Sequence, residues 1–161
     1  MLEIRKANLE DAQLIHELVH QIYYPTYKEI LSQGQIDFML EKSYTIKALQ
    51  ESMSLDQDFY LALYDQRPVG FIALGAKDHK ILRIEKLYLL PSTQGKGIGL
   101  KLIEFAKESA KKQDKSIVEL NVNRGNKAYY FYLKTGFKVI EEVDIPYFGY
   151  VLDDYVMQIS I

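Results

Sequence analysis

The sequence of 161 residues contains no cysteine and no tryptophan. Without cysteine the chain can form no disulfide, no cysteine-ligated zinc or iron–sulfur site and no thiol nucleophile. The lack of disulfides is typical of reducing compartments, and we expect a cytoplasmic protein. The opening residues, Met1-Leu2-Glu3-Ile4-Arg5, are too charged for the apolar segment of a signal peptide. No run of about 18 apolar residues occurs, so we predict no membrane-spanning helix.

An excess of charge of one sign is also missing, since 20 Lys and Arg residues face 22 Asp and Glu residues and leave a net charge of −2. This balance argues against a nucleic-acid-binding protein and against a basic membrane-surface helix. The length and the hydrophobic share of 48% suit one buried core. No Gly/Ser-rich or Pro-rich linker and no repeat divides the chain, which predicts a single domain over residues 1–161.

The apolar pattern predicts a layered α/β domain with a mixed sheet, in the order β-α-α-β-β-β-α-β-α-β-β. Asn8 is expected to cap a first helix, which Pro25 is expected to end. Irregular turns and helix are expected from there to about Ser54. Strands are expected at residues 2–5, 59–64, 69–74, 81–90, 117–122, 139–143 and 150–159, and further helices after residue 97 and at 128–134.

A glycine-rich turn, Gln94-Gly95-Lys96-Gly97-Ile98-Gly99, follows the strand that ends at Pro91. Glycine at every second position allows backbone N–H groups to converge where a Cβ would block them. The helix that follows adds unpaired N–H groups and the positive end of its dipole. The turn therefore predicts a phosphate or pyrophosphate site, with a tight turn that binds nothing as the alternative. The residues after Gly97 and Gly99 match neither a Walker A loop nor a dinucleotide fingerprint.

A second motif follows the next predicted strand, and the two motifs together resemble the GNAT N-acetyltransferase superfamily. Gln94, Gly97 and Gly99 match its signature Gln/Arg-x-x-Gly-x-Gly/Ala. The signature Asn-x-x-Ala-x-x-Phe-Tyr-x-x-x-Gly-Phe is met, with the alanine one position early, by Asn126, Ala128, Phe131, Tyr132, Gly136 and Phe137. The resemblance implies an α/β (α+β) fold with a mixed, mostly antiparallel sheet of about six or seven strands and helices on both faces. Within the superfamily, residues 82–89 and 147–157 look most like bacterial spermidine/spermine and diamine acetyltransferases.

The resemblance implies direct transfer of an acetyl group from acetyl-CoA, bound as the acyl donor, to a primary amine in a ternary complex. The backbone N–H of Leu87 would stabilise the oxyanion, and Leu89 and Asn126 would contact the pantetheine arm between two splayed parallel strands. The glycine turn would hold the pyrophosphate. The cofactor-binding residues implied in this way are Leu87, Leu89, Gln94, Gly95, Lys96, Gly97, Ile98, Gly99 and Asn126.

The reaction also needs a base and an acid, because an alkyl amine of pKa ~10.4 must lose a proton before it attacks. Glu85 is the candidate base, directly or through a water, since alternation along a strand would place it on the face of Leu87. The alternative for Glu85 is a surface carboxylate paired with Arg83 or Lys86. Tyr132 matches the acid position of the family, and its phenol, of pKa ~10, would protonate the departing thiolate. The alternative for Tyr132 is an ordinary core tyrosine.

The acceptor is expected to be a small polyamine or diamine, for which carboxylates and aromatic faces are suitable partners. The candidate residues are Asp153, Asp154, Glu141, Glu142 and Asp144, together with Tyr23, Tyr24 and Tyr27. A peptide, a protein lysine, an amino acid or an aminoglycoside stays open as the acceptor, and so does an acetyl-CoA sensor without catalysis. Exposed aromatic residues such as Phe148 and Tyr150 would permit a homodimer.

A rival motif, His16-Glu17-Leu18-Val19-His20, matches the His-Glu-x-x-His pattern of zinc peptidases. Such a site would need a third ligand. His79 is the one other histidine, so that ligand would be a carboxylate such as Glu41. The alternative is a pair of partly exposed histidines on an amphipathic helix, and we expect no metal.

Overall fold

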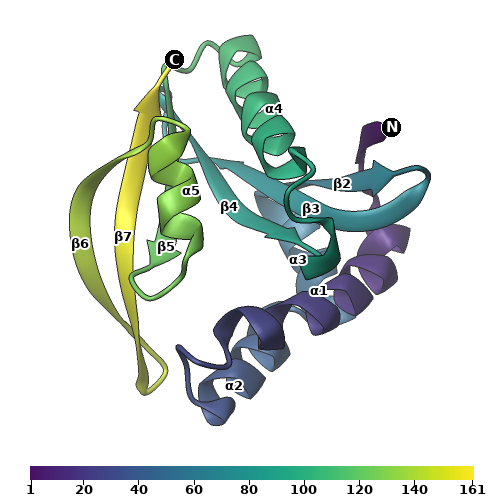
Figure 1. The fold of residues 1–161 in the computed structure, drawn as a ribbon, viewed down its shortest axis with the longest axis vertical. Coiled ribbons are helices and arrows are strands. Elements are labelled where there is room, and N and C mark those ends of the chain that lie inside the picture. The colour runs from purple at the N-terminus through teal and green to yellow at the C-terminus, as the bar shows by residue number, and fades with distance from the viewer.

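The computed structural model describes residues 1–161 and contains seven strands and five α-helices (Figure 1). The strands are β1 (Leu2–Lys6), β2 (Asp58–Tyr64), β3 (Arg67–Ala76), β4 (Ile81–Leu89), β5 (Ile117–Asn123), β6 (Lys138–Tyr147) and β7 (Tyr150–Ser160). The helices are α1 (Ala12–Tyr27), α2 (Gln33–Ser43), α3 (Ile46–Leu55), α4 (Ile98–Lys112) and α5 (Ala128–Lys134). All seven predicted strands are present, and one more helix than predicted lies between β1 and β2.

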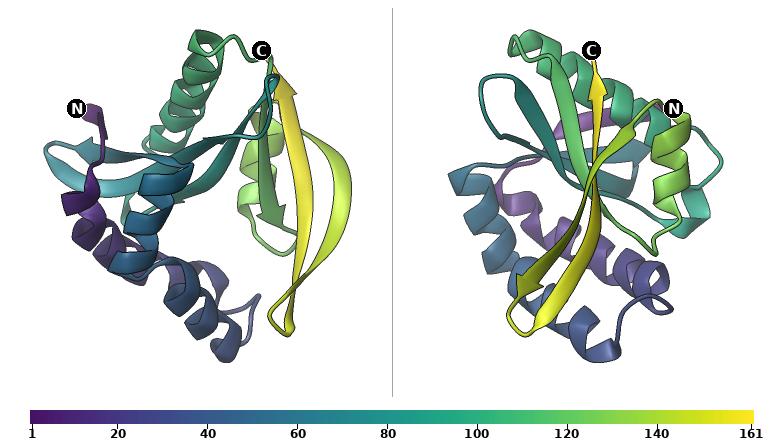
Figure 2. Two further views of the ribbon diagram at one scale, coloured as in Figure 1. Left: turned by 180° about the vertical axis from the view of Figure 1, so that it is seen from behind. Right: turned by 90° about the vertical axis from the view of Figure 1, so that its left-hand side faces the viewer.

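All seven strands form one sheet in the order β1-β2-β3-β4-β5-β7-β6. Every neighbouring pair is antiparallel except β4 and β5, which are parallel. Helices α1–α3 cover one face of the sheet, and α4 and α5 cover the other (Figure 2). The predicted fold class is therefore confirmed. None of the helices is long and apolar enough to cross a membrane.

The central strand β3 shows why the core has two parts. Successive side chains of a strand point to opposite faces. Phe71 and Ala73 therefore pack against α1–α3, while Ile72 and Leu74 pack against α4 and α5. A strand buried on both faces is apolar at nearly every position, and the pattern of β3 follows this rule.

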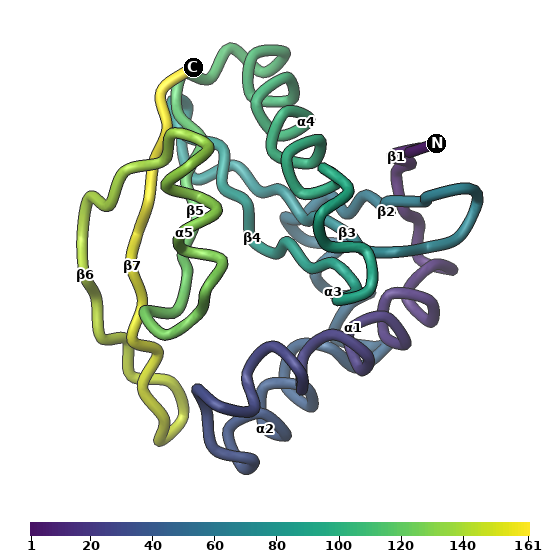
Figure 3. The backbone as a smooth tube through the Cα atoms, viewed as in Figure 1, coloured from purple at the N-terminus to yellow at the C-terminus, as the bar shows by residue number.

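Strands β4 and β5 separate part-way along their length. They pair only between Ile81–Ile84 and Ile117–Leu120. Beyond these residues β4 stays with β3, and β5 stays with β7. Figure 3 shows the two strands diverging toward the side of α1 and α2. The separation begins at a β-bulge, where Ala73 pairs with Lys86 and Leu74 pairs with Ile84, so that Glu85 has no partner.

The segment after the first helix differs from the prediction. Pro25 does not end α1, which continues to Tyr27. A proline this close to the end of a helix removes one backbone hydrogen bond, and burial of Tyr27 holds the last turn in place. The residues that follow form two regular helices, capped by the side chains of Ser32 and Thr45.

Candidate active site

The glycine turn presents the unpaired N-terminus of α4. Gly95 and Gly97 have φ values of +87° and +74°, which L side chains rarely adopt. Gly97 is the N-cap of α4, and no side chain caps this helix end. The first hydrogen bond of the helix runs from the N–H of Lys101 to the carbonyl of Gly97, so the preceding N–H groups are free to bind an anion.

The other residues of the turn have distinct positions. Ile98, the first residue of α4, is buried, whereas Gln94 and Lys96 are exposed. The Lys96 ammonium lies 5.0 Å from the centre of the Tyr64 ring. Gly99 has no unusual φ, but a Cβ built on it would lie 3.2 Å from Cζ of Phe131, so glycine here allows α4 and α5 to approach closely.

The backbone of β4 faces the gap between β4 and β5 at two predicted positions. The N–H of Leu90 donates to the carbonyl of Val69 on β3 (2.8 Å). In an antiparallel pair these bonds are made by every second residue, so the N–H and carbonyl groups of Leu87 and Leu89 point away from β3. They point into the gap where β5 no longer pairs with β4. Strand β4 therefore offers two unpaired peptide groups beside the glycine turn.

Asn126 precedes α5 and Tyr132 lies in its second half, on the other side of the gap. The Oδ1 of Asn126 accepts a hydrogen bond from the N–H of Ala128 (2.9 Å). Tyr132 is buried beside Phe137, at 5.8 Å between ring centres. Burial and the nearby phenol of Tyr27 raise the pKa of Tyr132, so its hydroxyl stays protonated at neutral pH. The Tyr132 hydroxyl has no hydrogen-bond partner within the protein. The one fully buried side-chain polar atom without a partner is Nε2 of Gln35, so the Tyr132 hydroxyl is accessible to solvent.

Glu85 does not lie on the face of Leu87 and Leu89, and this part of the prediction is wrong. The bulge inserts one residue and shifts the alternation, so Leu87 and Leu89 pack toward α4 while Glu85 lies on the opposite face. There its Oε1 is 3.4 Å from Nε of Arg83. A Cβ built on Gly75 of β3 would lie 3.3 Å from the same oxygen.

Arg83 connects Glu85 to a polar network on this face of the sheet. Its guanidinium donates to Glu119 and to Oδ1 of Asn121 (2.9 Å). The Nδ2 of Asn121 then donates to Oδ2 of Asp154 on β7 (3.2 Å). One ion pair and two hydrogen bonds therefore connect the carboxylate of Glu85 on β4, through Asn121 on β5, to that of Asp154 on β7.

A group of four aromatic rings, the tyrosine cluster (Tyr23, Tyr27, Tyr44 and Tyr88), lies on the same face of the sheet. The ring centres of Tyr23 are 4.6 Å from Tyr27, 5.5 Å from Tyr44 and 5.9 Å from Tyr88. The hydroxyls of Tyr27 and Tyr88 are 3.0 Å apart. Burial raises the pKa of all four phenols, so each stays neutral at pH 7.

Comparison with known proteins identifies the family. A family model described as "Acetyltransferase (GNAT) domain" matches residues 27–145 of the chain. The chain belongs to the GNAT acetyltransferase family. This GNAT chain is 32% identical over 149 residues to a spermidine N(1)-acetyltransferase of Thermoplasma acidophilum, which covers 89% of this chain and 91% of that one. It is 27% identical to an aminoalkylphosphonate N-acetyltransferase of Salmonella typhimurium, over 84% of each chain.

A solved structure supports the same assignment. The crystal structure of the PaiA N-acetyltransferase from Thermoplasma acidophilum in complex with coenzyme A matches this GNAT enzyme with a TM-score of 0.86. The identity is 30%, over 100% of this chain and 99% of that one.

The carboxylates proposed for acceptor binding separate into two groups. Glu141, Glu142 and Asp144 on β6 are exposed, and Asp144 pairs with Arg124. Asp153 and Asp154 on β7 are half-buried. Asp153 accepts a hydrogen bond from Nδ2 of Asn123 (3.2 Å), and Asp154 joins the network described above. The exposed three therefore lie on the outer surface of the GNAT enzyme. Tyr24 is likewise 47% exposed, whereas Tyr23 and Tyr27 are buried in the tyrosine cluster.

Sequence reasoning missed three residues of the polar network. They are Glu119, Asn121 and Arg83, which lies at its centre. One signal for them was present in β5, where polar residues alternate with Val118, Leu120 and Val122. That alternation indicates a strand with one apolar and one polar face. A polar row on a strand in the middle of the sheet needs hydrogen-bond partners on its neighbours, and this was the signal for the network.

The histidine motif has a structural explanation in this GNAT enzyme. Nδ1 of His16 lies 2.7 Å from the carbonyl oxygen of Tyr44, and Glu17 accepts a hydrogen bond from Gln13. The two imidazole rings of His16 and His20 are in contact, at 4.3 Å between ring centres. No group of three or more His, Asp or Glu side chains suited to a metal ion occurs in residues 1–161. The third ligand that a zinc peptidase requires is therefore missing.

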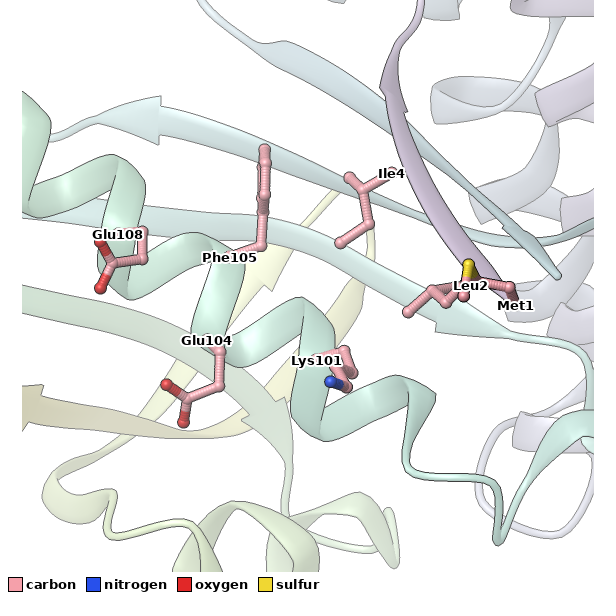
Figure 4. A pocket seen from close by; sticks show the side chains of 7 residues that line it. All are labelled: Met1, Leu2, Ile4, Lys101, Glu104, Phe105 and Glu108. Carbon is pink, nitrogen blue, oxygen red and sulfur yellow. The ribbon is translucent and has the colours of Figure 1, made fainter.

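One cavity of the GNAT enzyme lies away from these residues. It has a volume of about 450 Å³ and is an open hollow between β1 and α4 (Figure 4). The side chains of Ile4 and Phe105 line it, with Glu104 and Glu108 at its edge. None of the predicted site residues lines this hollow, so it carries none of the predicted chemistry.

Proposed function

We propose that residues 1–161 form one acetyltransferase domain that acetylates a small polyamine or diamine with acetyl-CoA as the donor. The observation that supports the proposal best is the gap between β4 and β5. At this gap the peptide groups of Leu87 and Leu89 are unpaired, close to the uncapped N-terminus of α4. A bound acetyl-CoA supplies the acetyl group as a thioester. The relatives named above support an amine as the acceptor.

The proposed roles follow from what each group can donate or accept. The free N–H groups from Gly95 to Gly99 bind the pyrophosphate, because they carry the positive end of the α4 dipole. The N–H of Leu87 donates to the oxygen that becomes negative during attack, while Leu89 and Asn126 hold the arm of the donor. Strand backbone is rigid, so these donors need no reorganisation when charge develops.

The proton transfers are assigned to two side chains. Glu85 removes a proton from the acceptor ammonium, through a water because its carboxylate faces Arg83. Tyr132 donates a proton to the departing thiolate, since its hydroxyl is protonated at neutral pH, and the second proton lost by the acetylated nitrogen restores the phenol. The products are the acetylated amine and CoA with a free thiol.

A thiol assay tests the proposal directly. Because the chain contains no cysteine, a thiol-reactive dye reports only the CoA released by turnover. We expect release with acetyl-CoA plus spermidine or a diamine, and much slower release with amino acids or peptides. Faster release with peptides would overturn the polyamine assignment. Binding of acetyl-CoA without release across all amines would instead favour a sensor.

A further inference from the structure

Asp154 is a half-buried carboxylate without a cationic partner. None of the ion pairs in the structure includes it. Its hydrogen bond within the chain comes from the neutral amide of Asn121 (3.2 Å). The other carboxylate of this network that lies deep in the sheet, Glu119, receives Lys77, Arg83 and Gln158. A buried carboxylate is costly unless a cation compensates it, so Asp154 is an unfilled position in an otherwise paired network.

The surroundings of Asp154 suit an organic ammonium group. Asp154 is opposite Asn123 in the sheet and bonds to Asn121, so it lies on the polar face of β5, which is also the face of the tyrosine cluster. Aromatic faces attract alkylammonium ions, and a carboxylate adds a direct hydrogen bond. Lys86, the cation already at the cluster, is held by Oε1 of Gln57 (2.8 Å) against the ring of Phe59.

The hairpin that carries Asp154 also contacts α2. Phe38 of α2 contacts Tyr150 of the β6–β7 hairpin, at 5.5 Å between ring centres. Asp154 is further connected to the proposed base, because Asn121 donates to Asp154 and accepts from Arg83, which pairs with Glu85. The carboxylate and the proposed base therefore lie on one face of the sheet. An acceptor with two amino groups can lose a proton beside Glu85 while its other nitrogen reaches Asp154.

We propose that Asp154 binds the non-reacting ammonium group of the acceptor, with Asn121 as its positioning residue, so that the enzyme selects diamines and polyamines over monoamines. This inference rests on the proposed acetyl transfer. The ammonium stays protonated at Asp154, and no proton passes to this carboxylate. Asp154 is thus a specificity-determining residue, distinct from the proposed base Glu85.

Kinetics of Asp154→Asn test the proposal. We expect KM for spermidine to rise at least tenfold, with kcat reduced less than threefold and KM for acetyl-CoA unchanged. For 1-aminobutane, which has no second charge, kcat/KM should not change. A matched control is Asp58→Asn on β2, whose exposed carboxylate pairs with Lys6 (3.4 Å). It should leave both acceptors unaffected.

Several results would overturn the inference. An unchanged KM for spermidine in Asp154→Asn would do so while leaving acetyl transfer itself in place. Equal losses for spermidine and 1-aminobutane would indicate a general structural role. If the native enzyme acetylates no amine, the proposed function fails instead.

Discussion

Replacing Glu119 by alanine should remove a large part of the stability of this protein. Glu119 is the one charged side chain that is fully buried. It accepts hydrogen bonds from Arg83, from Lys77 (3.1 Å) and from Gln158 (2.7 Å). Removing one partner of a buried ion pair costs up to about 3–5 kcal/mol, and here the remaining pair of Arg83 with Glu85, whose side chain is 30% exposed, offsets part of this cost. Arg83 is the partner that matters, since its side chain is 19% exposed whereas that of Lys77 is 49% exposed.

The magnitude is large compared with a typical total stability of about 5–15 kcal/mol. Urea unfolding at pH 7, followed by tyrosine fluorescence, gives the free energy of unfolding of both proteins. The matched control is Glu108→Ala on α4, whose carboxylate is 61% exposed and pairs with Lys111. Apart from intrinsic helix preference, this exposed pair should contribute less than about 1 kcal/mol.

Acid adds a second test of the same reasoning. Burial raises the pKa of Glu119, but hydrogen bonds from Gln158, Arg83 and Lys77 outweigh it, and the pKa lies below the ordinary value of 4.5. The stabilisation is therefore present above about pH 4.5 and is lost as the pH falls through the pKa of the folded state. The difference between native protein and Glu119→Ala should shrink in acid. A loss below about 1 kcal/mol at pH 7, or a difference independent of pH, would refute the argument.

Three further predictions concern the site. Tyr132→Phe should lower kcat about 100-fold or more without changing KM for acetyl-CoA, whereas the control Tyr130→Phe, at an exposed residue, should change neither constant. Undiminished turnover of Tyr132→Phe would show that Tyr132 is not the acid. Gly97→Ala, at φ +74°, should raise KM for acetyl-CoA about fivefold or more, since an L residue in this conformation costs about 1–2 kcal/mol; an unchanged KM would show that the turn does not hold the donor. Burial raises the pKa of the clustered phenols, so their contribution to the free energy of unfolding should be fully present below about pH 10 and decrease above it. Tyr44→Phe should make this decrease shallower. Unfolding at pH 8 and pH 10.5 measures this effect, and a slope unaffected by Tyr44→Phe would contradict it.

The sequence predicted what depends on local chemistry. The glycine turn could be placed, because glycine at every second position is a local signal, and the structure adds that Gly97 has a φ of +74°. The strands could be predicted because the alternation of apolar and polar residues indicates which face of a strand is buried. Two features depend on tertiary structure and could not be read in this way. The bulge at Glu85 leaves the composition of the strand unchanged, and helix α1 continues through Pro25 because packing of Tyr27 outweighs one missing hydrogen bond.

The same distinction applies to the acceptor side. Asp144 and Asp154 are equivalent in the sequence, since both lie in closing strands rich in carboxylates. They differ because β7 lies between β5 and β6, which places Asp154 inside the sheet and Asp144 on its outermost strand. Which carboxylate is buried is decided by strand order, and strand order is not encoded by any local pattern.

The divergence of β4 and β5 gives this sheet four edges instead of two. From Glu85 on β4 and Asn121 on β5, backbone groups in the middle of the sheet lack a neighbouring strand. Free strand edges are templates for pairing with other chains. A donor that binds in this gap would close both inner edges, and at a concentration of 1,000 times its Kd it would stabilise the fold by about 4 kcal/mol. The supply of the acyl donor would then set how long the protein resists aggregation and proteolysis, as well as how fast it works.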